Sequence, residues 1–111
     1  MRFILTFKPT EQCATNAHPK MVELCARLRA EGVLQSAIGL RGSETGARVR
    51  LAGDRVSVTD GPFAETKELI AGLAIVDVPD KATAVDLARE FLAIGGGGES
   101  DVREVNEAAN F

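Results

Sequence analysis

The chain has 111 residues, the length of one domain, and its 45% hydrophobic and 26% charged residues are those of an ordinary soluble globular protein. The formal net charge is −3, from 13 basic and 16 acidic residues. This balance argues against a surface that collects nucleic-acid phosphates, so we expect no nucleic-acid partner.

The first part of the chain alternates strand and helix patterns. Arg2–Phe7 places apolar side chains on both faces of a strand, which predicts that both faces are covered. Pro19 suits the first turn of a helix, and Gly32 suits its C-terminal cap. Apolar residues recur along that helix at i, i+3, i+4 and i+7, namely Met21, Leu24, Cys25 and Leu28. Val33–Leu40 predicts a second strand.

The second part begins with a hairpin, Arg48–Asp60, whose turn is Gly53-Asp54. Leu69–Val78 is apolar almost throughout and predicts a central strand. Asp80 is the expected N-cap of a second helix. The buried stripe of that helix is Ala84, Leu87, Ala88 and Phe91. Val102–Val105 predicts a short strand at a sheet edge.

This order of elements predicts an α+β protein, a ferredoxin-like split βαβ sandwich with an inserted β-hairpin. We expect a single domain over residues 1–105 and a C-terminal tail over 106–111. Two helices cover one face of the sheet. Ile4 and part of Leu69–Val78 point to the other face, which therefore needs a cover from outside the chain. A second copy packed sheet to sheet is the simplest cover, so we expect a homodimer.

Cys13 and Cys25 are the two cysteines, and the chain has one histidine, which does not make a zinc site. We expect two free thiols and no bound metal. The N-terminal MRFILTF is too short for the apolar stretch of a signal peptide. No apolar run approaches the ~20 residues of a membrane span. We therefore expect a cytoplasmic protein with no membrane partner.

The stretch VTDGPFAETKEL, Val58–Leu69, combines a Gly-Pro pair, mixed charges and one aromatic residue. Asp60 is placed to cap the amides that follow it, Gly61 frees the backbone, and Pro62 fixes φ. Phe63 is placed to hold the turn in apolar surroundings. These roles predict a capped crossover that leads from the hairpin to the central strand.

The string DGPFAETKE, within VSVTDGPFAETKE (Val56–Glu68), resembles the signature of the DGPF proteins of the YCII-related family. The resemblance implies a ferredoxin-like fold that dimerises into an α+β barrel with a cleft between the sheets. Family members are mostly of uncharacterised function. Some are associated with extracytoplasmic-function sigma factors, and the fold is similar to that of small enzymes such as muconolactone isomerase.

The chain departs from this family at one functional position. Better-studied YCII-like members are thought to use a histidine on the first helix, paired with an aspartate. Met21 stands where that histidine would fall, and His18 lies about one turn earlier, before a proline. The histidine–aspartate pair is therefore not carried over to this chain.

Candidate catalytic residues are Asp60, Glu65 and His18, each a possible proton acceptor. The competing interpretations are a turn cap for Asp60, a solvated surface charge for Glu65 and an exposed loop residue for His18. Candidate ligand-binding residues are Thr59, Gly61, Pro62, Phe63, Lys67 and Glu68.

Three functions remain open at this point. The first is a homodimer that binds a small organic ligand, without a cofactor, in a cleft beside the DGPFAETKE segment. The second is a small isomerase or lyase on the same scaffold, with a carboxylate as proton acceptor. The third is a protein-interaction module linked to a sigma factor.

Overall fold

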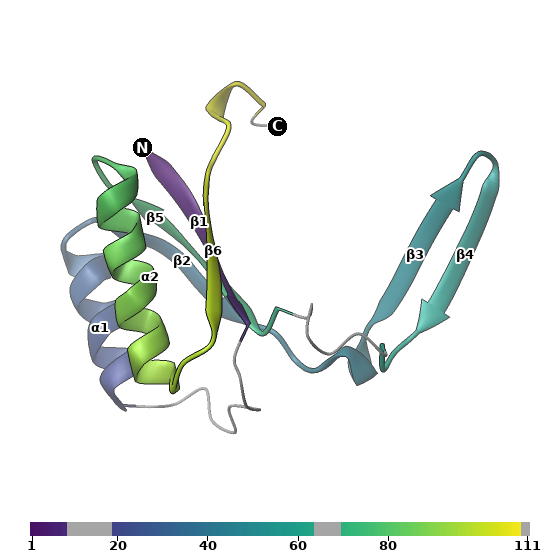
Figure 1. Ribbon diagram of the computed structural model, residues 1–111, viewed down its shortest axis with the longest axis horizontal. Coiled ribbons are helices and arrows are strands. Elements are labelled where there is room, and N and C mark those ends of the chain that lie inside the picture. The colour runs from purple at the N-terminus through teal and green to yellow at the C-terminus, as the bar shows by residue number, and fades with distance from the viewer. Residues whose placement is uncertain (9–18, 64–69, 110–111) are drawn as a thin grey trace.

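A computed structural model describes residues 1–8, 19–63 and 70–109 of the chain (Figure 1). The strands are β1 (Arg2–Lys8), β2 (Leu34–Gly39), β3 (Ala47–Ala52), β4 (Arg55–Asp60), β5 (Gly72–Asp77) and β6 (Glu99–Glu104). The helices are α1 (Pro19–Ala30) and α2 (Lys81–Gly95), with the short 3-10 helices η1 (Ser43–Thr45) and η3 (Glu107–Ala109). No described helix is long and apolar enough to span a membrane.

The main sheet has four strands in the order β2-β5-β1-β6, and every neighbouring pair is antiparallel. This topology confirms the predicted α+β class and is consistent with a ferredoxin-like fold. The apolar strands β1 and β5 lie in the centre. The edge strand β6 begins at Glu99, earlier than the predicted Val102, because its polar residues still form backbone pairs with β1 as far as Lys8. An edge strand needs backbone partners more than apolar side chains.

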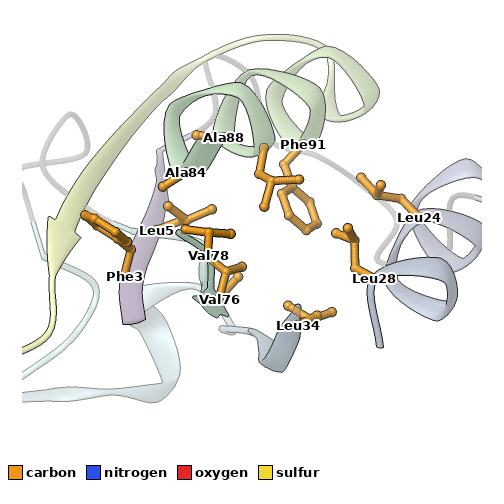
Figure 2. Packing of buried hydrophobic residues seen from close by; sticks show 12 residues of the cluster. Phe3, Leu5, Leu24, Leu28, Leu34, Val76, Val78, Ala84, Ala88 and Phe91 are labelled. Carbon is orange, nitrogen blue, oxygen red and sulfur yellow. The ribbon is translucent and has the colours of Figure 1, made fainter. Parts of the chain in front are cut away.

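The core lies between the main sheet and the two helices (Figure 2). Phe3 and Leu5 of β1 and Ala74 and Val76 of β5 point to the helices and are almost completely buried. The full set of buried hydrophobic residues is Phe3, Leu5, Leu24, Leu28, Leu34, Ala74, Val76, Val78, Ala84, Leu87, Ala88 and Phe91. The predicted helical stripes supply six of these, so the 3.6-residue period identified the core-facing sides of α1 and α2.

The other face of the main sheet, which we call the open face, has no described helix over it (Figure 1). Its apolar residues are Ile4, Ile38, Leu73 and Ile75. Ile4 is paired with Ile75 across β1 and β5, and Ile38 is paired with Leu73 across β2 and β5. Ile38 is 52% exposed, and the other three are half-buried. The described part of a single chain therefore covers one face of β1, and the expected cover of the other face from outside the chain stays a prediction.

The predicted hairpin is present as β3 and β4, which form a separate two-stranded sheet joined at Gly53 and Asp54. It stands away from the body on the side of the main sheet opposite the helices (Figure 1). The radius of gyration is 15.7 Å, whereas a compact chain of this length has about 13 Å. The projecting hairpin accounts for the extended shape.

The helix ends follow the predicted caps. α1 begins at Pro19, and Gly32, with φ of 76°, follows its last turn. The Gly32 amide donates to the Arg29 carbonyl and the Val33 amide to the Leu28 carbonyl, a pattern that needs a left-handed residue at Gly32. Asp80 caps α2, because its Oδ1 accepts from the Thr83 amide at 2.8 Å and from the Thr83 hydroxyl at 2.7 Å.

The chain beyond β6 is tied to the first strand. Arg2 donates from Nε and Nη2 to the two carboxylate oxygens of Glu107, each at 2.7 Å. The hydrogen bond from Arg2 lowers the pKa of the Glu107 carboxyl. Residues expected to form a simple tail therefore include a short helix, η3, held beside β1 by a bidentate ion pair.

We predict that the Asp80 cap gives α2 a stability that depends on pH. Hydrogen bonds from the Thr83 hydroxyl and amide lower the pKa of Asp80 in the folded protein. The cap's contribution is therefore complete above the ordinary aspartate pKa of about 3.9 and is lost as the pH falls through the lower folded-state pKa. Replacing Asp80→Ala should lower the melting temperature at pH 7 by about 3–8 °C.

The matched control is Asp80→Asn, which keeps a capping oxygen but does not titrate. The melting temperatures of the wild type and Asp80→Ala should converge as the pH is lowered towards 2. The difference between Asp80→Asn and Asp80→Ala should persist over the same range. If the difference in melting temperature between the wild type and Asp80→Ala stayed constant with pH, the assignment of Asp80 as a titrating cap would be contradicted.

Candidate functional site

We call residues 60–68, the DGPFAETKE string, the DGPF segment. Its described part, residues 60–63, packs against the 3-10 helix η1. Gly61 donates from its amide to the Gly46 carbonyl at 2.9 Å, and Phe63 donates from its amide to Ser43 Oγ at 3.0 Å. The Gly61–Pro62 peptide bond is cis. Ser43, rather than Asp60, therefore satisfies the amide that follows the Gly-Pro pair.

The space around Gly61 excludes any residue that has a Cβ atom. A Cβ built on Gly61 would collide with the carbonyl oxygen of Ser43 and would lie 3.3 Å from the Glu44 amide nitrogen. The obstructing atoms belong to the backbone, which cannot rotate away as a side-chain end can. The close approach of Gly61 to η1 thus explains a glycine in the motif without any ligand.

Phe63 fixes the base of the hairpin. The guanidinium carbon of Arg48, on β3, lies 4.5 Å from the centroid of the Phe63 ring, which is a cation–π contact. Both side chains are half-buried. Phe63 was expected to hold the turn in apolar surroundings, and the structure instead places its ring against an arginine and its amide against η1.

Two of the candidate residues, Thr59 and Asp60, lie on the surface of the described chain. Thr59 and Asp60 are exposed at the end of β4, where Asp60 is paired with Ala47. Among the described residues the Asp60 carboxylate accepts no hydrogen bond, so its predicted cap does not form there. The candidates His18, Glu65, Lys67 and Glu68 lie outside the described residues.

An apolar cavity of about 480 Å³ lies elsewhere, between α1, α2 and the end of the sheet formed by β2 and β5. This volume falls within the usual range for small-molecule sites. The walls include Phe7, Met21, Cys25, Phe91 and Ile94. The rings of Phe7 and Phe91 contact each other with their centroids 5.4 Å apart. We call this space the helix–sheet cavity.

One charged side chain, Arg29, is found among the described residues that line the helix–sheet cavity. It is exposed on the last turn of α1. The neighbouring Arg27 differs, since its Nη2 donates to Glu90 Oε1 at 3.0 Å. The cavity therefore has aromatic and aliphatic walls, with one guanidinium available for an anionic group.

The sequence pattern pointed to some of these lining residues but not to the cavity. Met21 and Cys25 were assigned to the buried stripe of α1, yet both are half-buried beside the cavity, and Cys25 is a free thiol. Met21 is also the residue that stands at the histidine position of the resemblance described above. A second hollow, of about 590 Å³, lies between α2 and β6. Residues 59–63 line neither space.

Comparison with models of protein families shows to which family the chain belongs. The model of the YCII-related domain matches residues 1–107, which is nearly the entire sequence. The chain belongs to the YCII-related family. No curated protein matches it significantly. The family match covers the described elements from β1 into η3, and it therefore includes the helix–sheet cavity and the hairpin of this YCII-related protein.

We predict that Gly61→Ala destabilises the YCII-related protein by about 1–3 kcal/mol, because a methyl group overlaps the Ser43 carbonyl. Gly46→Ala is the matched control in the same region. Its Cβ would lie 3.6 Å from the same Ser43 oxygen, an ordinary contact, so its free energy of unfolding should change by less than about 0.5 kcal/mol. Urea unfolding of both variants measures the difference, and equal stabilities would contradict the close-packing argument.

Proposed function

We propose that this YCII-related protein binds a small organic molecule in the helix–sheet cavity. The observation that carries the proposal is an apolar space of about 480 Å³ with a single charged group, Arg29, among its described lining residues. Apolar walls with a few polar groups are the usual construction of a small-molecule site. The proposal moves the expected ligand site from the DGPF segment to the opposite side of the sheet.

The lining selects a chemical class of ligand. The side chains of Phe7 and Phe91 offer aromatic contact area, while Met21 adapts to irregular shapes because its side chain is unbranched and flexible. Arg29 favours a carboxylate, which a guanidinium binds with two hydrogen bonds in one plane. The expected ligand therefore combines an aromatic or aliphatic body with one carboxylate.

The proposed active unit is a homodimer in which the open faces of two copies pack together. The support is the set of apolar side chains on that face, Ile4, Ile38, Leu73 and Ile75, over which no described helix lies. An aliphatic patch in the middle of a sheet usually marks an interface. A two-fold dimer uses the same patch on both chains, so one self-complementary face suffices.

The alternative functions gain no support from the described residues. Asp60 is exposed and lines neither cavity, so its geometry does not favour an isomerase or lyase that uses it as a proton acceptor. Nothing among the described residues bears on a sigma-factor partner.

We predict that carboxylates such as 1-naphthoate and decanoate raise the melting temperature of the full chain, whereas the matching primary amides do so less. Arg29→Gln should weaken carboxylate binding by roughly tenfold or more, because a hydrogen bond to a charged group is lost. It should leave binding of the amides nearly unchanged. Thermal-shift titration followed by calorimetry measures both effects.

Arg27→Gln is the matched control, because Arg27 lies on the same helix but is paired with Glu90 away from the cavity. A second variant, Cys25→Leu, adds volume to the cavity wall and should weaken carboxylates and amides alike. The ligand class would be refuted if Arg29→Gln and Arg27→Gln had the same effect. The cavity itself would be refuted as the site if Cys25→Leu left every affinity unchanged.

A further inference from the structure

One face of the β3–β4 hairpin is aliphatic and uncovered beyond the Ala47–Asp60 pair at its base. Val49 is paired with Val58, and Leu51 is paired with Val56, so the four side chains lie side by side on one face. Their exposed fractions are 67% for Val49, 68% for Leu51, 64% for Val56 and 64% for Val58. We call these four residues the hairpin patch.

The opposite face of the hairpin is polar and cationic. Arg48 is paired with Thr59 and Arg50 with Ser57, while Arg55 follows at the turn end. Beyond the Ala47–Asp60 pair the hairpin is thus two-sided like a strand pair that rests on a core, although no described residue covers the hairpin patch. A two-stranded hairpin is marginally stable at best in water unless one face is packed. The pattern therefore calls for a covering surface.

We infer that the hairpin patch packs against a second copy of this chain. The hairpin of each copy extends beyond its own sheet and covers apolar surface on the partner. This inference rests on the homodimer proposed above and adds a second contact region to it.

The position of the hairpin favours a second copy as the occupant. The hairpin projects on the side of the main sheet that carries the open face (Figure 1). A partner that packs against the open face therefore occupies the side on which the hairpin projects. One partner then covers both apolar surfaces of the chain, the open face and the hairpin patch.

The area that a stable dimer needs also favours this arrangement. Interfaces between stable partners bury about 800 Å² on each side. An aliphatic patch of four side chains provides on the order of 300–600 Å² at most, as does a patch of similar size on the open face. Neither surface alone reaches the usual area, and the hairpin patch and the open face together come closer to it.

The charge distribution is complementary between the hairpin and the rest of the chain. Residues 47–60 contain three arginines and two aspartates and carry a net charge of +1, while the remainder of the chain carries −4. A hairpin of one copy that lies close to the body of another therefore lowers the repulsion between two chains that each carry −3.

The test compares two double variants of the full chain at the same level of the hairpin. Leu51→Thr with Val56→Thr removes aliphatic groups from the hairpin patch, and Arg50→Thr with Ser57→Thr changes the opposite face at an adjacent pair. Threonine keeps a high strand propensity in both. Because each change occurs twice in a two-fold dimer, the patch variant should raise the dimer dissociation constant at least about 100-fold, whereas the control should change it less than about tenfold. Sedimentation equilibrium measures both constants.

A photo-crosslink keeps the inference testable if the patch variant folds poorly. Val58→p-benzoylphenylalanine should give a covalent dimer of the purified protein on irradiation, and Ser57→p-benzoylphenylalanine should give much less. A wild type that stays monomeric at micromolar concentration would overturn the inference. So would a dimer that neither crosslinks at position 58 nor responds to the patch variant, or a hairpin that binds lipid vesicles and not a second copy.

The outcomes separate this inference from the proposed function. Ile75→Lys on the open face should also dissociate the dimer, so a dimer lost with Ile75→Lys but kept with the patch variant would support the sheet contact and overturn the hairpin contact. Carboxylate binding is measured in parallel. The helix–sheet cavity is built from a single chain, so its failure to bind carboxylates would refute the ligand site and leave the hairpin result standing.

Discussion

Two helices can cover only one face of a four-stranded sheet, and the rest of this structure follows from that limit. The central strands β1 and β5 carry aliphatic side chains on both faces. Phe3, Leu5, Ala74 and Val76 are buried beneath α1 and α2, whereas Ile4, Leu73 and Ile75 on the reverse face are only half-buried. The described chain thus completes one core and leaves a second apolar surface partly exposed.

The helix–sheet cavity and the DGPF segment have different physical origins. The cavity lies where the helices pack over the end of β2 and β5, and its wall on the sheet side includes the small residues Ala37, Ala71 and Gly72. The DGPF segment instead joins the hairpin to η1, through the Gly61 close approach and the Arg48–Phe63 contact. One feature is an apolar space between helices and sheet, and the other is a set of contacts at the base of the hairpin.

Local rules predicted the parts of the fold that depend on neighbouring residues. The apolar period of α1, the Asp80 cap and the hairpin around Gly53-Asp54 were all readable from the sequence, because each is decided within a few residues. The helix–sheet cavity was not readable, since Phe7, Arg29 and Ile94 come together only after the helices pack. The Asp60 cap was expected from ordinary turn chemistry, but Ser43, which is distant in sequence, supplies the bonding oxygen.

The pairing of β1 with strands from the far end of the chain has a consequence for synthesis on the ribosome. Phe7 pairs with Gly72, and Lys8 pairs with Glu99. The main sheet therefore cannot close until these distant partners have been synthesised. Such distant contacts make folding slow, whereas the hairpin needs only its own fourteen residues, 47–60. A nascent chain therefore presents the aliphatic residues of the hairpin before β5 and β6 have been made and the main sheet can close.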